Sequence, residues 1–218
     1  MNKVIDSKNN TLNFSNEKPT LYQLGEDIAE DREILKKKPN ISLDTNGYVN
    51  QESSTFLRKF HPEIVLYCPK IPQNTGTIAR LCAAFSCTLH LIEPLGFKIS
   101  DKALRRAGLD YWQFVEVILH KSWDDFIIKK KTRRFIFIET GCAERPENFL
   151  FMPGDLIVFG AETHGIPKEI IEKFTSHQNG SKLTIPMFNR GVRSINLANS
   201  VSIVLYTAVA QLNWGKTL

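Results

Sequence analysis

The sequence predicts an α/β protein built on one parallel sheet. From about residue 63 onward, short runs of continuous apolar residues alternate with segments of helical spacing. Continuous apolar runs are typical of strands that are buried on both faces. Strands that alternate with helices pair in parallel, because each crossover helix returns the chain to the same end of the sheet. We therefore expect a single α/β domain over residues 61–218.

The expected elements follow from apolar runs, helical spacing and turn residues between them. Strands are predicted at residues 64–68, 89–92, 114–119, 135–138, 156–159 and 183–185. Helices are predicted at residues 77–85, 101–109, 123–130 and 167–174, the last with Pro167 at its first position. The longest helical pattern comes last, with an apolar residue every third or fourth position between 197 and 212. Ser194 is the expected N-cap of this helix.

Residues 1–60 have a different composition. They are rich in Asn, Lys, Ser, Asp and Glu, and only residues 21–35 show a weak helical pattern, which ends at three lysines and Pro39. A polar stretch of this kind buries little apolar surface. We expect an N-terminal extension that is partly disordered. Its lysine run could contact RNA, although a solvated charge cluster is the simpler interpretation.

Composition limits the class of protein and its partners. The 218 residues are 42% hydrophobic and 23% charged, as in soluble globular proteins, and the net charge of +5 permits a polyanionic partner. The four cysteines form no CxxC pair and the five histidines no HExxH spacing, so we expect neither a metal site nor a disulfide framework. The N-terminus lacks the apolar segment of a secretory signal, and no stretch approaches a membrane span. A cytoplasmic protein without a membrane partner is expected.

Four polar loops follow predicted strands. They read PKIPQNTG, ETGCAERP, GAETHGIP and PMFNRGVRS, after the first, fourth, fifth and sixth strands. Parallel sheets bind ligands beyond the carboxyl ends of their strands, so these loops should meet at one edge of the sheet. The last loop leads two arginines into a helix N-terminus, which favours an anionic ligand. The alternative is an ordinary capped helix under a solvated basic loop. GxGxxG, GxxxxGK[ST] and GxSxG are all absent, which disfavours the usual dinucleotide, P-loop and serine-hydrolase sites.

Three ordered motifs carry a family resemblance. NTGTIAR at 74–80, GAETHGIP at 160–167, and IPM at 185–187 followed by RSINLA at 193–198 resemble the motifs of the SPOUT superfamily of RNA methyltransferases. More closely, IPQNTGTIARLC, LIEPLGF, LRRAGLDY and RSINLANSVSIVLY resemble the small tRNA (cytidine/uridine-34) 2′-O-methyltransferases, over about residues 63–214. The resemblance implies a deep trefoil knot near the C-terminus, S-adenosylmethionine bound in the knotted loops, and a homodimer. It also implies methylation of the wobble ribose in the tRNA anticodon loop.

The resemblance assigns roles to particular positions. The cofactor-binding residues that it implies are Ile138, Gly160, Ile185 and Ser194, with Glu162, Met187 and Leu197 as neighbours. Gly160 would let backbone approach an adenine or ribose, and the two isoleucines would form an apolar slot, although ordinary strand core explains them equally well.

The catalytic residues expected from the resemblance are Asn74, Arg80 and Tyr206. The family reading often makes the arginine a base, but deprotonating a guanidinium near pH 7 costs roughly 7 kcal/mol at about 1.4 kcal/mol per pKa unit. We hypothesise that Arg80 stabilises the developing alkoxide and a phosphate, while RNA phosphate or water takes the proton. Tyr206 is expected near the dimer and RNA surface, with helix core as the alternative. Thr207 and His164 depart from the Glu and Arg common in relatives.

RNA binding is consistent with several basic residues. These are Arg105, Arg106, Lys129 to Lys131, Arg133, Arg134 and Arg190. Phosphate contacts of this kind position RNA without specifying its sequence. Two alternatives stay open: a ribose methyltransferase for another tRNA or rRNA position, and a non-catalytic RNA-binding protein. A metabolic α/β enzyme is disfavoured by the missing phosphate loops.

Overall fold

The computed structural model describes residues 44–46, 49–99, 111, 114–130, 132–176 and 180–214. The helices predicted at 21–35 and 101–109 lie outside these residues, as do Arg105, Arg106 and Lys131. No helix in the described part of the chain is long and apolar enough to span a membrane.

The described chain contains a six-stranded sheet in which every neighbouring pair is parallel, as predicted. Its strands are β1 (Glu63–Tyr67), β2 (Leu89–Ile92), β3 (Val117–His120), β4 (Phe135–Ile138), β5 (Leu156–Phe159) and β6 (Gly180–Leu183), in the order β3-β2-β1-β5-β4-β6. The predicted bounds of β2, β4 and β5 are confirmed. Apart from the buried His90 of β2, these strands are apolar, because the sheet is covered on both faces.

Three predicted strands are displaced. β1 begins and ends one residue earlier than the predicted 64–68, because it starts with the buried but charged Glu63, which gives no apolar signal. β3 begins three residues later than expected, and the preceding Phe114 is exposed. The sixth strand was predicted at 183–185, but β6 ends at Leu183, where its pairing with β4 also ends. Because β6 lies at the sheet edge, it tolerates the polar residues of GSKL and gives no apolar signal. Ile185 consequently lies in the loop after the strand, not within it.

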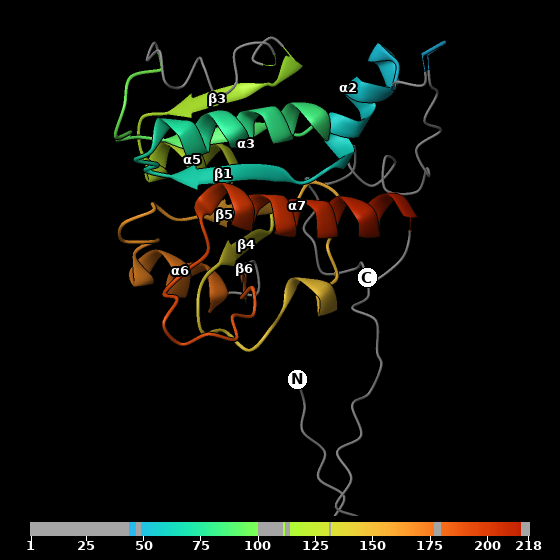
Figure 1. Ribbon diagram of the computed structural model, residues 1–218. Helices are drawn as coiled ribbons and strands as arrows, with labels where there is room; N and C mark the ends of the chain where they lie inside the picture. Colours follow the sequence, from blue (N-terminus) through green and yellow to red (C-terminus); the bar gives the residue numbers. More distant parts are fainter. Residues whose placement is uncertain are drawn as a thin grey trace, which may run out of the picture.

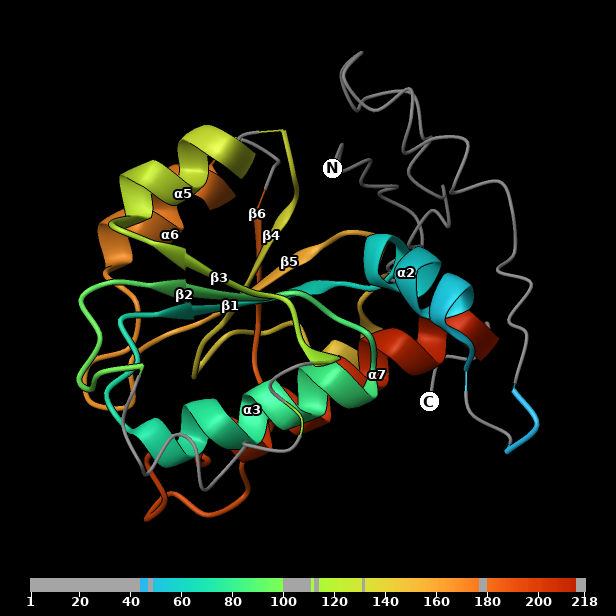
Figure 2. The same cartoon turned by 90° about the horizontal axis from the view of Figure 1, so that it is seen from above.

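Helices cover both faces of the sheet (Figures 1 and 2). α3 (Pro72–Ala84) and α7 (Leu197–Trp214) pack on one face, in the larger core cluster. α5 (Trp123–Lys130) and α6 (Lys168–Thr175) lie on the other, over an aromatic-rich core. A short 3₁₀ turn, η4 (Pro146–Asn148), precedes β5. The bounds of α5 are as predicted, and α6 begins one residue late with Pro167 as its N-cap.

The starts of α3 and α7 also differ from the prediction. α3 begins at Pro72, five residues before the expected start, so Asn74 lies in its first turn and not in a preceding loop. The N-cap of α7 is Asn196, not Ser194. The Asn196 side-chain oxygen accepts hydrogen bonds from the backbone amides of Ala198 (2.9 Å) and Asn199 (3.3 Å). Asn and Ser are equally good caps, and the loop path places the asparagine at the helix start.

Helix α2 (Gln51–Phe60) lies within the stretch predicted to be an extension. Asn50 caps it, and its Leu57 and Phe60 are buried against the body. The following His61 hydrogen-bonds to the backbone oxygen of Phe85 at 2.6 Å and to the side chain of Asn213 at 2.9 Å. These contacts tie α2 to the C-terminal ends of α3 and α7.

Candidate functional site

A cavity of about 490 Å³ opens where β4, β5 and β6 end. Its lining comes from the loops after β1, β4, β5 and β6 and from the start of α7. The predicted meeting of these four loops is confirmed. The volume lies within the range of small-molecule sites.

The cavity collects most of the residues singled out from the sequence. All seven predicted cofactor residues line it: Ile138, Gly160, Glu162, Ile185, Met187, Ser194 and Leu197. Asn74 also lines it, whereas Arg80 and Tyr206 are not among its lining residues. The wall therefore combines apolar side chains with amides, hydroxyls and carboxylates.

Glu162 fixes the start of α3 from a distant part of the chain. Its two carboxylate oxygens accept hydrogen bonds from the backbone amides of Lys70 (2.8 Å) and Ile71 (3.2 Å), and from the side-chain amide of Asn74 (3.0 Å). The N-cap residue of α3, Ile71, has no side chain that could accept these hydrogen bonds. An acceptor with negative charge is favoured at a helix N-terminus, where amides lack partners.

Asn74 continues this chain of hydrogen bonds to α7. Its side-chain oxygen accepts from the Asn196 amide at 3.1 Å, while its own amide donates to Glu162. Since Asn196 also caps α7, one set of three side chains joins the β1–α3, β5–α6 and β6–α7 connections. The sequence analysis named Asn74 and Glu162 but did not assign this role to Asn196. The only local feature that indicated it was its position just before the predicted helix, two residues after Ser194.

Gly160 is required by the loop itself. Residues Ala161 and Gly165 pair through two backbone hydrogen bonds, which close the loop tightly, and Gly165 has a positive φ of 67°. A Cβ on Gly160 would stand 2.3 Å from the carbonyl carbon of Gly165. The absence of a side chain therefore lets two backbone segments approach, in addition to any approach of a ligand.

Arg80 contacts Tyr111 outside the cavity. Its guanidinium donates to the tyrosine hydroxyl at 3.1 Å and lies 4.4 Å from the ring centroid. The contact combines a hydrogen bond with a cation–π interaction. Arg80 is exposed on α3 and Tyr206 is 46% exposed on α7, so both side chains are accessible at the surface.

Glu139 is a cavity-lining residue that sequence reasoning did not single out. It follows the last residue of β4 directly and belongs to the loop ETGCAERP. Burial raises the pKa of its carboxyl group, while a hydrogen bond from the backbone amide of Ile166 partly opposes this rise. The loop was recognised as informative, but a single acidic residue in it gave no specific signal.

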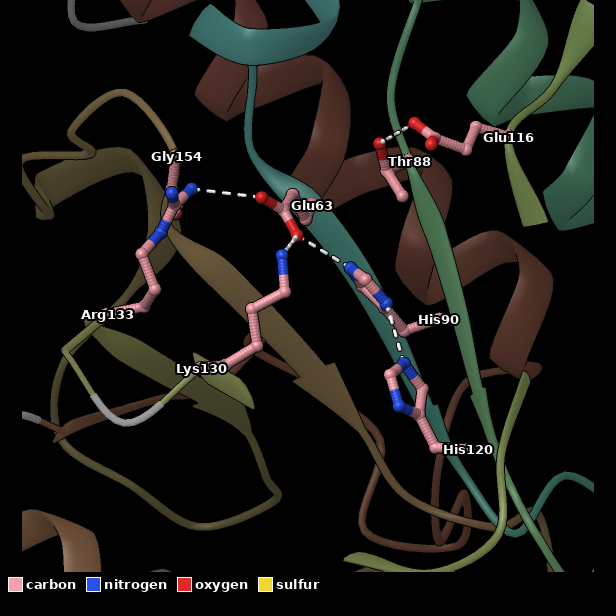
Figure 3. Close-up of polar contacts among 8 residues, drawn as sticks. All are labelled: Glu63, Thr88, His90, Glu116, His120, Lys130, Arg133 and Gly154. Atoms are coloured by element: carbon pink, nitrogen blue, oxygen red, sulfur yellow. Dashed lines mark hydrogen bonds and ion pairs between the residues drawn. The ribbon is translucent and has the colours of Figure 1, made fainter. Parts of the chain in front are cut away.

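A second cluster of titratable groups lies around Glu63, away from the cavity (Figure 3). Its carboxylate pairs with Lys130 (2.5 Å) and Arg133 (3.0 Å) and accepts from His90 (2.6 Å), which in turn bonds to His120 (3.0 Å). Burial alone would raise the Glu63 pKa, but these partners lower it to about 2. Both carboxylate oxygens of Glu63 thus have partners, whereas the Nδ1 atom of His120 is buried without a hydrogen-bond partner and lies 3.7 Å from the Asp125 carboxylate.

Several of the basic residues predicted to contact RNA form ion pairs within the protein. Besides Lys130 and Arg133, Arg134 pairs with Asp155 at 2.6 Å and Lys129 with Asp125 at 3.0 Å. Arg190 is exposed in the loop before α7. Within the described ranges, no group of three or more His, Cys, Asp or Glu is placed to hold a metal ion, and all four cysteines are free thiols.

The parallel sheet and the cavity at its carboxyl edge define a ligand-binding α/β protein. Comparison with known proteins specifies the class further. The family model of the SpoU rRNA methylases matches residues 61–206. The chain belongs to the SpoU rRNA methylase family.

Individual relatives agree with this assignment. The chain is 42% identical over 151 residues to a tRNA (cytidine(34)-2′-O)-methyltransferase of Burkholderia ambifaria, covering 68% of this chain and 94% of that protein. A solved structure described as giving insights into 2′-OH methylation of C/U34 on tRNA superposes with a TM-score of 0.66 at 38% identity, over 72% of this chain and 99% of the other. An AdoMet-bound rRNA methyltransferase from Sinorhizobium meliloti shares the fold, with a TM-score of 0.60 at 19% identity over 75% and 70% of the two chains.

Proposed function

We propose that this protein transfers a methyl group from S-adenosylmethionine to the ribose 2′-hydroxyl of the wobble nucleotide, position 34, of tRNA. The observation that carries the proposal is the cavity, which gathers all seven residues matched to cofactor sites. The proposal is also supported by the 42% identity to an enzyme named for this reaction, over 94% of that enzyme's length.

The cavity wall fits S-adenosylmethionine. Ile138, Ile185 and Leu197 offer an apolar slot for the adenine, and the backbone of the Gly160 loop offers amides and carbonyls to its polar edge. Ser194 and Arg193 contribute a hydroxyl and a cation for the methionine part. Bound there, the cofactor supplies an electrophilic methyl group on a sulfonium.

The protein's own contribution to the chemistry is positioning and electrostatics. Arg80, oriented by Tyr111, stabilises the developing 2′-alkoxide and the flanking phosphate, and RNA phosphate or water takes the proton. Asn74 keeps α3 and α7 in place through Glu162 and Asn196. Tyr206 contributes to the RNA and dimer surface.

We further propose a homodimer and a knotted C-terminal region. The outward face of α7 exposes Ile203 and Tyr206, and Ile71 is exposed at the cavity rim, so a second copy has apolar surface to cover. Arg80, outside the cavity of its own chain, can then act at a site that both protomers complete. The enzyme works in the cytoplasm, and residues 1–60 add an extension to the catalytic body.

Labelled S-adenosylmethionine and synthetic anticodon stem-loops test the activity. We expect label in stem-loops with a normal ribose at position 34 and none in stem-loops with a 2′-deoxy sugar there. Arg80→Ala should lower the methylation rate by more than tenfold, and Arg80→Lys should not restore it, because lysine lacks the forked donor geometry.

Lys59→Ala, an exposed substitution on α2, is the matched control and should leave the rate unchanged. If label appears at another tRNA or rRNA ribose, that ribose and not position 34 is the site of methylation. No label in any ribose would overturn the enzyme assignment, leaving a non-catalytic RNA-binding protein.

A further inference from the structure

Glu139 is the cavity carboxylate with unused hydrogen-bonding capacity. Its neighbour in the wall, Glu162, is occupied by three donors. For Glu139, the backbone amide of Ile166 is the hydrogen-bond donor. No ion pair joins it to a Lys, Arg or His of the described chain. An ionised carboxylate has about four lone-pair sites, so Glu139 can accept further hydrogen bonds.

The backbone fixes where this carboxylate lies. Glu139 follows Ile138, the last residue of β4, which pairs with Phe159 of β5 and Leu183 of β6. Its own amide donates to the Leu183 oxygen at 2.9 Å. Both carboxylate oxygens lie beside Gly165, within 3.9 Å of the position that a Cβ there would take. The side chain is therefore held between the Gly160–Gly165 loop and the apolar wall.

We propose that Glu139 binds the ribose of the cofactor, accepting hydrogen bonds from its vicinal 2′- and 3′-hydroxyls. The inference rests on the proposed function, because it takes S-adenosylmethionine as the ligand of the cavity. Glu139 adjoins Ile138 in sequence, and Ile138 is part of the apolar slot assigned to the adenine. The 2′- and 3′-hydroxyls are on the ring carbons one and two bonds from the base-bearing carbon, so they can reach a group next to that slot.

The chemistry matches in number and in position. A vicinal diol offers two donors to a carboxylate that has two oxygens. In dinucleotide-binding α/β folds, an acidic residue plays this part for a ribose hydroxyl. A half-buried carboxylate with a raised pKa lacks stabilisation of its charged form, and hydroxyl donors supply it.

The assignment of Glu139 to the ribose is tested by combining changes in the ligand with a change at Glu139, using the full-length protein. Calorimetry would measure the binding of S-adenosylmethionine, S-adenosylhomocysteine, 5′-methylthioadenosine and the 2′,3′-dideoxy form of 5′-methylthioadenosine. Loss of the hydroxyls should weaken binding to the unmodified protein by tenfold or more. Glu139→Gln should weaken the three ligands with an intact ribose by a similar factor and leave the dideoxy ligand nearly unchanged.

Glu144→Gln is the matched control. It removes a carboxylate from the same loop but from outside the cavity, so all four affinities should stay the same. A thermal melt checks that Glu139→Gln folds; Gln still offers an oxygen to the Ile166 amide. If this variant is unfolded, Glu139→Asp takes its place: it shortens the side chain by one methylene and should give the same selective loss for the ligands with an intact ribose.

The other outcomes overturn the assignment in different ways. If Glu139→Gln weakens S-adenosylmethionine but not its uncharged sulfur counterparts, the carboxylate faces the sulfonium and not the ribose. If no affinity changes, Glu139 contacts no part of the ligand. A protein that binds none of the four ligands overturns the proposed function itself, which separates that failure from a failure of the Glu139 assignment.

Discussion

Asn196 is predicted to support both the fold and the cavity, and Asn196→Ala should weaken both. The substitution removes the N-cap of α7 and the donor to Asn74. Loss of an N-cap costs about 1 kcal/mol. Leaving the oxygen of Asn74, which is 8% exposed, without its donor costs about 1–2 kcal/mol more. The free energy of unfolding should fall by about 2–3 kcal/mol, which corresponds to a Tm lower by about 4–12 °C in a chain of this size.

Asn196→Asp separates the two roles. Aspartate retains the capping oxygen and is favoured by the helix dipole, but it places a carboxylate oxygen against the Asn74 oxygen. Asn74 cannot simply rotate its amide, because its nitrogen already donates to Glu162. Thermal unfolding should therefore place Asn196→Asp between the unmodified protein and Asn196→Ala. Calorimetry should show both variants with weakened S-adenosylmethionine binding.

Ser194→Ala is the comparison that tests the reasoning. Since Ser194 is not the cap, its loss should leave Tm within about 1 °C and affect only cofactor affinity. The reasoning is refuted if Asn196→Ala melts like the unmodified protein, or if Ser194→Ala loses as much stability as Asn196→Ala.

Three further predictions concern the loop glycine and two carboxylates. Gly160→Ala should destabilise the fold by about 1–3 kcal/mol and weaken cofactor binding, because the new Cβ overlaps the Gly165 backbone; urea unfolding measures the first effect and calorimetry the second. Glu162→Gln should lower the free energy of unfolding by about 2 kcal/mol, since its amide nitrogen would face the donor of Lys70; equal stability by urea unfolding would contradict this. At pH 7, Glu63→Gln should cost about 3 kcal/mol, because the pKa is lowered from 4.5 to about 2. A lowered carboxyl pKa stabilises the fold above pH 4.5, so the difference between the two proteins should be constant from pH 5 to 7 and shrink below pH 4.5; a difference that grows on acidification would contradict this.

The strands predicted with correct bounds are those whose burial alone determines their residues. β2, β4 and β5 lie inside the sheet, and all their residues except His90 of β2 are apolar. β6 lies at the edge, where three of its four residues are not fully buried, and its sequence resembles a loop. The sequence signal of a strand is therefore weakest where the sheet stops.

The start of α3 was missed because its stabilisation is not local. Asn, Thr and Gly at positions 74–76 have low helix propensity and read as loop. Glu162 satisfies the backbone amides of residues 70 and 71 from the β5–α6 loop. A pattern within one segment cannot reveal a partner 92 residues away.

The position of the site was predictable, whereas the particular contacts were not. Loops after parallel strands must meet at the carboxyl edge, so the motifs could be assigned to one cavity. Which of Ser194 and Asn196 caps α7 depends on the path of the loop, which the two residue types do not determine. Glu139 gave no signal because one carboxylate in a polar loop is common, and only burial distinguishes it.

The contacts around Asn74 also indicate how the cavity and its ligand depend on each other. Its side chain joins residues 88 positions away at Glu162 and 122 positions away at Asn196. Contacts of such sequence separation form only after a large loop-closure cost has been met, so the three cavity walls should assemble together and late in folding. A ligand that touches all three walls binds only the assembled state and adds its binding free energy to them. The cofactor should therefore raise the Tm of the unmodified protein more, at equal concentration, than that of Asn196→Asp, in which one of the joining hydrogen bonds is lost.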